Sequence, residues 1–305
     1  MVSSALESSG GRCLITGMLG FTGMYVEREL RKAGYEVFGL ASSAMTSSLP
    51  DHVLAADLTD LQSVRRVVEQ VRPDVVIHLA AIAFVAHGDV DTIYRTNVVG
   101  TRNLLQALSE AQVTPRAVLL ASSANIYGNV ESDAIGEDTR PLPENDYAVS
   151  KLAMEYMARL WQNKLPITVV RPFNYTGVGQ SLNFLIPKIV DHFRRRAPEI
   201  ELGNLDVARD FSDVRVVAAA YCRLLEKPAD GQVFNICSGH AHSLGDVIAM
   251  LQEQAGYTIE VKVNPAFVRA NEVKRLCGSN ARLISAVGEL PAISLADTLQ
   301  WMYHA

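Results

Sequence analysis

The stretch Cys13-Leu14-Ile15-Thr16-Gly17-Met18-Leu19-Gly20-Phe21-Thr22-Gly23 joins a short apolar run to three glycines at three-residue spacing. The apolar run predicts a buried strand, and the segment from Tyr25 to Ala33 predicts a helix after the turn. Glycines can mark ordinary turns. Between a strand and a helix, however, they let the backbone approach a pyrophosphate at the helix N-terminus. We therefore expect a dinucleotide site that includes Gly17, Leu19, Gly20, Phe21, Thr22 and Gly23.

The next predicted strand, Glu36 to Leu40, ends in Ala41-Ser42-Ser43 and carries no acidic residue there. An acid at this position would bind the 2′-hydroxyl of NAD and repel the 2′-phosphate of NADP. Its absence favours NADPH, with NADH as the alternative, although no arginine follows to clamp the phosphate. We place Ser42, Asp57 and Leu58 at the adenine end. The alternative role for Asp57 is a turn or a helix cap.

Strands and helices alternate through the first half of the chain. Thr59-x-x-Gln62 resembles a capping box before an apolar helix face, and Pro73 ends that helix. Such alternation, with nearly continuous apolar strands, predicts an α/β fold with a doubly wound parallel Rossmann sheet. The expected strands are 13–15, 36–40, 74–79, 117–121 and 167–171, and the expected helices are 25–33, 64–71, 96–111 and 147–161.

The second half of the chain is less regular and predicts a smaller substrate-binding lobe. We expect a disordered tail at 1–11, the NAD(P)-binding Rossmann domain at 12–174, and mainly the substrate-binding lobe at 175–305. The strand expected at 233–236 returns to the main sheet, so that the two lobes interleave. The lobe is predicted to hold helices at 186–196, 214–225 and 244–254 and a strand at 259–263.

Composition excludes several classes of function. The chain has 305 residues, 49% hydrophobic and 20% charged, with a formal net charge of −5, so we expect no nucleic-acid partner. No apolar run of about 18 residues is present, so we expect no membrane partner. The four cysteines are widely scattered, which predicts no metal site and a reducing, cytoplasmic setting. The Ser/Gly-rich start does not resemble a signal peptide.

Tyr147 and Lys151 stand four residues apart in the run Asn145-Asp146-Tyr147-Ala148-Val149-Ser150-Lys151. On a helix this spacing places both side chains on one face. A free tyrosine has a pKa of about 10, and a neighbouring ammonium favours the phenolate and lowers that pKa. The pair therefore suits proton exchange with an alcohol or ketone. An ordinary amphipathic face would show the same two residues.

Ala121-Ser122-Ser123-Ala124-Asn125-Ile126-Tyr127-Gly128 follows the strand at 117–121, at the sheet edge where open α/β folds bind ligands. The glycine turn, this serine segment and the Tyr147/Lys151 pair occur in an order that resembles the extended short-chain dehydrogenase/reductase superfamily. The resemblance runs from Cys13 to about Trp301 and points to the branch acting on nucleotide-diphosphate sugars. It implies that Ser123, Tyr147 and Lys151 are catalytic. It also implies that Leu79, Ala80, Ala81, Tyr147 and Lys151 contact the cofactor.

Three further segments resemble reductases of GDP-4-keto-6-deoxy-mannose and the related dehydratases. They are Arg171-Pro172-Phe173-Asn174-Tyr175-Thr176-Gly177-Val178-Gly179-Gln180, Leu202-Gly203-Asn204-Leu205-Asp206-Val207-Ala208-Arg209-Asp210-Phe211, and Asn271-Glu272-Val273. The resemblance implies a GDP-sugar site made by Asn125, Asn174, Lys188, Arg209, Arg269 and Glu272. Arginine and lysine would neutralise the diphosphate of the substrate. Without the resemblance, each would be read as a surface ion-pair partner.

The two residues after Ser123 separate reduction from dehydration. Dehydratases of this superfamily carry an acid, or an Asp-Glu pair, directly after the catalytic serine or threonine, where this chain has Ala124 and Asn125. An asparagine does not exchange a proton at neutral pH. The expected activity is NADPH-dependent reduction of the C4 ketone of a GDP-4-keto-6-deoxy sugar, giving GDP-D-rhamnose for surface polysaccharide.

Two alternatives remain from the sequence. A nucleotide-sugar 4-epimerase would use the same Ser123, Tyr147 and Lys151 with a tightly bound NAD. A non-catalytic NADP(H)-binding or scaffold protein would bind the cofactor without turnover. We also expect a homodimer, packed through the helices at 96–111 and 147–163, because members of the superfamily often dimerise in that way.

Overall fold

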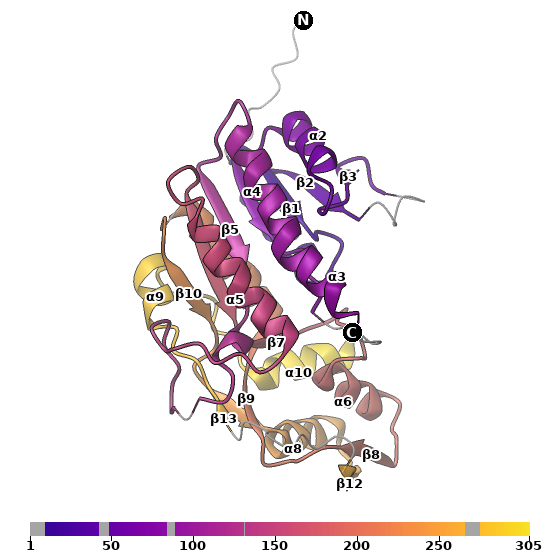
Figure 1. The fold of residues 1–305 in the computed structure, drawn as a ribbon. Coiled ribbons are helices and arrows are strands. Elements are labelled where there is room, and N and C mark those ends of the chain that lie inside the picture. Colours follow the sequence, from indigo (N-terminus) through magenta and orange to yellow (C-terminus); the bar gives the residue numbers. More distant parts are fainter. Residues whose placement is uncertain (1–9, 43–48, 84–88, 131, 228, 266–274) are drawn as a thin grey trace, which may run out of the picture. The chain divides into compact units, whose positions relative to one another are not determined.

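The computed structural model describes residues 10–42, 49–83, 89–130, 132–227, 229–265 and 275–305. It divides the chain into two compact units, each built from several segments. The first unit comprises residues 1–126, 143–171 and 218–234, and the second comprises residues 127–142, 172–217 and 235–305. The boundary expected at residue 174 stays a prediction. Figure 1 shows the elements in chain order.

The main sheet has seven strands in the order β10-β6-β5-β4-β1-β2-β3. Its strands belong to the first unit, except that β6 and β10 end in residues of the second. The strand pairs with a stated register from β3 to β6 are all parallel. This confirms the predicted doubly wound Rossmann sheet. The strands are β1 (Arg12–Thr16), β2 (Glu36–Ala41), β3 (Val53–Ala55), β4 (Val75–His78), β5 (Ala117–Ala121), β6 (Ile167–Pro172) and β10 (Val233–Ile236).

The strand order reverses between β1 and β4. The chain moves from β1 outward to β2 and β3 and then returns to β4 on the other side of β1. Because such crossovers are right-handed, the connections on the two sides of β1 place their helices on opposite faces. Open α/β sheets bind ligands at such a reversal, outside the carboxyl ends of the strands. The fold thus places the glycine turn after β1 beside the loop after β4.

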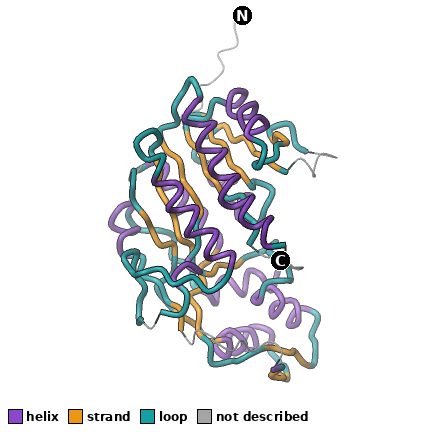
Figure 2. Tube along the Cα trace, viewed as in Figure 1, coloured by secondary structure: helices purple, strands orange, loops and turns teal. Residues whose placement is uncertain are grey.

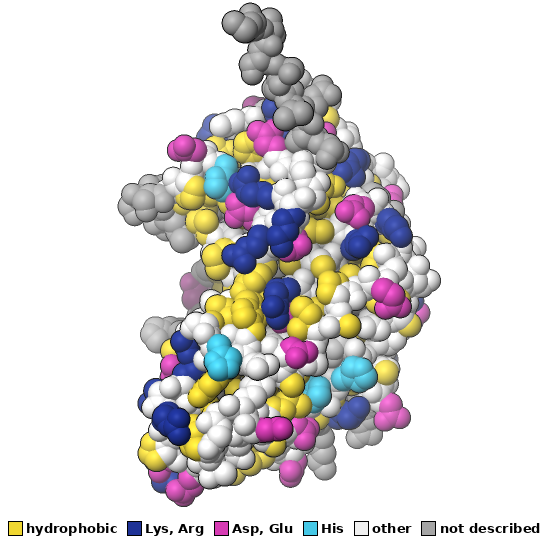
Figure 3. All heavy atoms as spheres, turned by 180° about the vertical axis from the view of Figure 1, so that it is seen from behind, with side chains coloured by type: hydrophobic (Ala, Val, Ile, Leu, Met, Phe, Trp, Pro, Cys, Tyr) yellow, Lys and Arg dark blue, Asp and Glu magenta, His cyan; other side chains and the backbone are white. Residues whose placement is uncertain are grey.

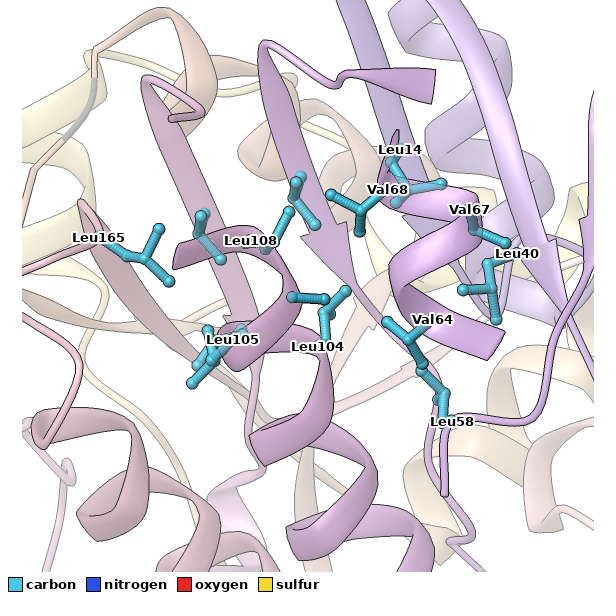
Figure 4. Packing of buried hydrophobic residues seen from close by; sticks show 14 of the residues in the cluster. Leu14, Leu40, Leu58, Val64, Val67, Val68, Leu104, Leu105, Leu108 and Leu165 are labelled. Carbon is cyan, nitrogen blue, oxygen red and sulfur yellow. The ribbon is translucent and has the colours of Figure 1, made fainter. Parts of the chain in front are cut away.

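Helices α2, α4 and α5 pack on one face of this sheet (Figures 1 and 2). In Figure 4, Val68 of α2 lies close to Leu14, Val67 lies close to Leu40, and Val64 lies close to Leu58. The leucines of α4 belong to the same buried cluster. Burying each such side chain contributes about 1.5–3 kcal/mol. The helices of this unit are α1 (Phe21–Lys32), α2 (Leu61–Val71), α3 (Val90–Tyr94), the π-helical turn η2 (Arg95–Gly100), α4 (Thr101–Glu110) and α5 (Asp146–Arg159).

Three helix starts differ from the prediction. Helix α1 begins at Phe21, inside the glycine stretch, because Gly20 adopts an extended N-cap conformation and its carbonyl accepts from Met24 N. Asp60 caps α2, since its carboxylate accepts from Gln62 N, so the expected role of Thr59 as the cap was wrong. The helix expected from Thr96 begins at Val90 and includes the π-helical turn η2.

The second unit carries two smaller sheets. One has the order β11-β9-β13, with β7 also paired to β9, and the other joins β12 to β8. Its core comes mainly from one face each of α6, α8 and α10. The elements are the 3₁₀ turn η3 (Ala124–Tyr127), which starts in the first unit, β7 (Asn174–Thr176), α6 (Leu185–Arg194), β8 (Glu199–Leu202), β9 (Ala208–Asp213), α7 (Val214–Glu226), which is shared by the units, β11 (Ala241–Ser243), α8 (Leu244–Ala255), β12 (Glu260–Val263), β13 (Arg275–Leu276), α9 (Ala281–Val287) and α10 (Leu295–His304).

Surface charge is mixed. On the face that Figure 3 shows, acidic and basic side chains are interspersed with apolar ones across the described residues. Within the described residues, no helix combines the length and apolar character needed to cross a membrane. All four cysteines are buried free thiols.

Candidate active site

The glycine turn is shaped by close backbone contacts. Gly17 has a φ of +73°, and a Cβ built there would lie 2.9 Å from Ala80 N. A Cβ at Gly23 would lie 2.4 Å from Met18 O, inside the first turn of α1. Only glycine therefore lets β1, the turn and α1 pack this closely. The turn leaves a backbone cradle at a helix N-terminus, which fits the pyrophosphate of a dinucleotide.

The other expected cofactor residues follow the carboxyl ends of β4, β2 and β3 in the first unit. Leu79, Ala80 and Ala81 form the half-buried loop after β4, where Leu79 N donates to Thr16 O. Ser42 is exposed at the end of β2. The Asp57 carboxylate accepts from Thr59 N and Thr59 Oγ1, both at 2.8 Å, which is the turn role left open by the sequence.

Leu58 connects the segment after β3 to α4. Its side chain is buried, and its carbonyl accepts from Asn103 Nδ2 at 2.9 Å. A Cβ at Gly100 would lie 3.0 Å from Leu58 Cβ, so the π-helical turn passes close to this segment. The position of Leu58 is therefore fixed from α4 as well as from the sheet.

Lys151 lies one helical turn after Tyr147 on α5, and both belong to the first unit. The Lys151 Nζ lies 6.0 Å from the centroid of the Tyr147 ring and donates to Ala121 O at 2.7 Å. Helix α5 begins next to the pair because Asn145 caps it, accepting from Ala148 N through its side chain. The structure thus anchors the lysine to the end of β5 and holds the tyrosine close to it.

The charge of Lys151 depends on two opposing effects. Burial lowers its pKa to about 8, and the carboxylate of Glu155 acts in the opposite direction. Glu155 is itself held by Arg171 through bonds of 3.0 Å (Nε to Oε1) and 2.7 Å (Nη2 to Oε2), with both side chains at most 5% exposed. A lysine with this pKa is mostly protonated at pH 7, so it can act as the neighbouring cation of the tyrosine.

Ser123 follows β5 in the first unit and is buried. Its Oγ accepts from Asn125 N at 3.1 Å, which shapes the start of the turn η3. Ala124 is buried, and Asn125 is exposed on the same turn. The residues directly after Ser123 thus provide no carboxylate.

The expected substrate residues that the structure describes, Asn125 apart, lie in the second unit. Asn174 lies on β7 opposite Phe211 of β9, and Arg209 lies on β9 itself. Lys188 lies on α6, with its Nζ donating to Glu201 O at 3.3 Å. All three side chains are half-buried. Arg269 and Glu272 lie outside the described residues.

A group of buried polar residues in the first unit was not singled out by the sequence. Thr16, His78 and Thr101 are at most 1% exposed, and they link the ends of β1 and β4 to the start of α4. The sequence offered one sign of this group: each of the apolar strands β1 and β4 ends in a polar residue, Thr16 and His78. Among the described residues, no group of three or more His, Cys, Asp and Glu side chains is placed to hold a metal ion.

The chain matches a family model over residues 13–237, that of the NAD dependent epimerase/dehydratase family. It is 37% identical to a GDP-6-deoxy-D-talose 4-dehydrogenase of Aggregatibacter actinomycetemcomitans, covering 96% of this chain and 97% of the relative. It is 35% identical to a GDP-6-deoxy-D-mannose reductase of Pseudomonas aeruginosa, covering 95% of each.

Solved structures agree with this result. A crystal structure of a candidate epimerase from Burkholderia cenocepacia J2315 shares 51% identity and a TM-score of 0.93, covering 98% of each chain. The structure of RMD from Pseudomonas aeruginosa, complexed with NADPH, shares 34% identity and a TM-score of 0.84, covering 96% of this chain and 97% of that one. The protein therefore belongs to the NAD dependent epimerase/dehydratase family, as the order of its motifs predicted.

Proposed function

We propose that this protein reduces the C4 ketone of GDP-4-keto-6-deoxy-D-mannose with NADPH, giving GDP-D-rhamnose (GDP-6-deoxy-D-mannose) for surface polysaccharide. One observation carries the proposal. Two relatives that match nearly the whole chain, at 37% and 35% identity, are both named as oxidoreductases of a GDP-6-deoxy-hexose. The substrate residues would then include Asn125, Asn174, Lys188, Arg209, Arg269 and Glu272.

NADPH is supported by two features. The related RMD structure contains NADPH, and Ala41 and Ser42 at the end of β2 present no carboxylate to the adenine ribose. A carboxylate there would repel a 2′-phosphate. Gly17, Leu19, Gly20, Phe21, Thr22 and Gly23 would hold the pyrophosphate, and Ser42, Asp57, Leu58, Leu79, Ala80 and Ala81 would line the rest of the site. When bound, the reduced cofactor supplies the hydride.

The residues of the chain would manage the proton and the orientation of the ketone. Tyr147 would donate its phenolic proton to the alkoxide that forms at C4. The ammonium of Lys151, held on Ala121 O at 2.7 Å, would stabilise the resulting phenolate and bind the nicotinamide ribose. The Ser123 hydroxyl would donate a hydrogen bond to the carbonyl oxygen of the substrate. Such a bond strengthens as negative charge develops on that oxygen.

The turn after Ser123 supports reduction over dehydration. Elimination of water from a hexose needs a base and an acid at neighbouring carbons. Ala124 is apolar and buried, and Asn125 has no proton to exchange. Tyr147 is then the proton donor that this part of the site offers, and a single proton is what reduction of a ketone requires.

A second candidate product is GDP-6-deoxy-D-talose, which differs from GDP-D-rhamnose only in the configuration at C4. It is favoured by the 37% identity to the talose 4-dehydrogenase. The two products require hydride delivery to opposite faces of the same ketone. The same residues of the first unit would serve for both products. Formation of GDP-6-deoxy-D-talose would need a different orientation of the sugar, with the same hydride transfer and the same protonation by Tyr147.

The direct experiment mixes the protein with GDP-4-keto-6-deoxy-D-mannose and NADPH and follows the nicotinamide absorbance. We expect consumption of NADPH, and NMR of the product then assigns the configuration at C4. The matching UDP and dTDP sugars test the base. A folded protein that consumes no NADPH would contradict the proposal. Purified protein carrying a non-exchanging NAD, with no net consumption, would identify an epimerase. Cofactor binding without turnover of any nucleotide sugar would identify a scaffold.

We also propose a cytoplasmic homodimer. Apolar side chains are exposed at Val99 of η2 (44% exposed), at Tyr156 of α5 (56%) and at Leu160, the C-cap of α5 (79%). Paired helices from two copies would cover such side chains. Light scattering after gel filtration should give twice the 33.3 kDa mass of the chain. Replacing Leu160 by Glu should shift the mass toward that of one chain.

A further inference from the structure

Three buried side chains of the first unit form a continuous hydrogen-bonded row. Thr16 Oγ1 lies 2.6 Å from His78 Nδ1, and His78 Nε2 lies 2.7 Å from Thr101 Oγ1. Thr16 ends β1, His78 ends β4, and Thr101 begins α4. The row therefore crosses the place where the strand order reverses.

The neighbours of the row determine where its hydrogens lie. Thr101 Oγ1 lies 2.7 Å from Asn97 O, and a carbonyl oxygen can only accept. The single hydroxyl hydrogen of Thr101 is thus used on Asn97, and Thr101 Oγ1 must accept from His78 Nε2. The proton of a neutral His78 then lies on Nε2.

The opposite side of the ring agrees with this assignment. A neutral ring protonated at Nε2 accepts at Nδ1, so the Thr16 hydroxyl donates to it. Thr16 Oγ1 remains able to accept, and Ala80 N donates to it at 3.2 Å. Every donor in the row meets an acceptor. Burial, assisted by the charge of Lys151, lowers the pKa of His78 to about 3, so the ring is neutral at physiological pH.

Asn97 extends the row to the helix that carries Tyr147 and Lys151. Its Oδ1 accepts from Ile82 N at 2.9 Å, and its Nδ2 donates to Ile82 O at 3.1 Å and to Ser150 Oγ at 3.0 Å. Ser150 Oγ in turn donates to Tyr147 O at 2.7 Å. The loop after β4 and the first turn of α5 are thus held by one asparagine side chain.

We propose that His78, neutral and protonated at Nε2, is a positioning residue that couples the cofactor-binding loop after β4 to the catalytic helix α5. It acts through Thr16 and Ala80 on one side and through Thr101, Asn97 and Ser150 on the other. Cofactor binding that moves the loop after β4 would also move the hydrogen-bonded row that supports Tyr147. This inference rests on the proposed function only where it uses turnover, since cofactor binding and the histidine tautomer are measured without a sugar.

The first test observes His78 directly. A ¹⁵N-¹H correlation spectrum of protein labelled at histidine, assigned with His78→Gln, should show a neutral ring with its proton on Nε2. The signals should stay unchanged from pH 8 to pH 5. A proton on Nδ1, or a ring that titrates near pH 6.5, would overturn the proposal. This measurement decides the hydrogen-bond assignment even if the protein acts on no GDP-sugar.

The second test separates coupling from general stability. Thr101→Val removes the hydroxyl, and Thr101→Ser keeps it. The matched control is Thr168→Val on β6, where an equally buried threonine donates to Ala229 O at 2.9 Å. Well below the melting temperature, Thr101→Val should weaken NADPH binding and slow single-turnover hydride transfer, each by about tenfold. Thr101→Ser should restore both.

The outcomes of this second test are distinct. The Thr168→Val control should lower the melting temperature and leave NADPH affinity within about twofold, because Thr168 lies outside the row. If Thr101→Val and Thr168→Val changed the NADPH affinity equally, the row would affect only general stability. That result would overturn the proposal that His78 couples the loop to α5. Wild-type protein that binds NADPH but turns over no GDP-sugar would overturn the proposed function instead, and the affinity comparison would still decide the coupling.

Discussion

The two units contain buried polar centres of opposite kinds. In the first, the row from Thr16 to Ser150 is neutral and made chiefly of side chains that link two strand ends to two helices. In the second, the centre is the carboxylate of Asp210 on β9. It accepts from Ser238 N at 2.8 Å, Ser238 Oγ at 2.7 Å, Gly239 N at 2.9 Å and Gly278 N at 3.3 Å. The row in the first unit links α4 and α5 to the strand ends. The Asp210 carboxylate in the second unit, next to Arg209 in the sequence, holds the loops at Ser238 and Gly278.

The difference predicts opposite responses to acid. The pKa of His78 is lowered, so its contribution to stability is complete above pH 6.5 and is lost as the pH falls toward about 3. Burial raises the pKa of Asp210 against the hydrogen bonds that lower it. Asp210 contributes most to stability below the usual pKa of an aspartate. Its contribution declines as the pH rises through its own raised pKa. Acid should therefore weaken the contribution of His78 and leave that of Asp210 in place.

The largest effect should come from the proton donor in the first unit. Tyr147→Phe should lower the rate of hydride transfer about 10³-fold, since loss of a general acid costs about 10²–10⁴. NADPH affinity should change little. Tyr156→Phe on the exposed face of the same helix is the matched control. Stopped-flow absorbance measures both, and a Tyr147→Phe variant with the wild-type rate would remove Tyr147 from the mechanism.

The next largest effect should come from Asp210 in the second unit. Asp210→Ala leaves three buried or half-buried backbone N–H groups without their acceptor, at about 1–3 kcal/mol for a fully buried group. We expect the free energy of unfolding to fall by about 3 kcal/mol in urea. Asp206→Ala, at an exposed position four residues earlier, should change it by less than about 0.5 kcal/mol. A small effect of Asp210→Ala would show that the loops are held by other contacts.

Arg209 tests whether recognition of the substrate belongs to the second unit. Arg209→Ala should raise the KM for the GDP-sugar about 20-fold, equal to ~2 kcal/mol for a charged hydrogen bond to a diphosphate. The Kd for NADPH should not change. Arg195→Ala, which removes an exposed ion pair with Asp191, should leave both constants unchanged. A weaker NADPH affinity in Arg209→Ala would place Arg209 at the cofactor and break the division between the units.

The smallest effect is the acid response of His78. Between pH 7 and pH 5, His78 takes up a proton in the unfolded chain and stays neutral in the folded one. This difference lowers the free energy of unfolding by about 2 kcal/mol. His78→Gln should show a pH dependence of unfolding that is weaker by this amount. Urea titrations at the two pH values measure the difference, because the other ionisable groups cancel between wild type and variant. Identical pH dependences would mean that the folded His78 ring takes up its proton over the same pH range as in the unfolded chain.

Much of the first unit could be predicted from sequence because its signals are local. Cys13-Leu14-Ile15 and Gly17, Gly20 and Gly23 specify a strand, a turn and a helix within eleven residues. The Tyr147/Lys151 pair needs only helical spacing. The row around His78 could not be predicted, since Thr16 and Thr101 lie 85 positions apart and meet His78 only when β1, β4 and α4 pack together.

The start of α2 shows a smaller limit of sequence reasoning. Thr59 and Asp60 are both good caps, and the sequence pattern favoured Thr59 because of Gln62. The structure uses Asp60, while the Thr59 hydroxyl donates to Asp57. Two neighbouring capping residues differ by too little free energy for a pattern to choose between them. The substrate residues are less predictable still, because Asn174, Lys188 and Arg209 lie on three separate elements of the second unit.

The most direct test of ketone reduction by this protein follows the hydride itself. The protein is given GDP-4-keto-6-deoxy-D-mannose with NADPH deuterated on one face of the nicotinamide C4, and then with the opposite label. We expect one of the two labels to appear in the GDP-6-deoxy-hexose product, as a single deuterium on C4 detected by mass spectrometry and NMR. Release of a GDP-sugar without deuterium from either label would contradict ketone reduction by NADPH.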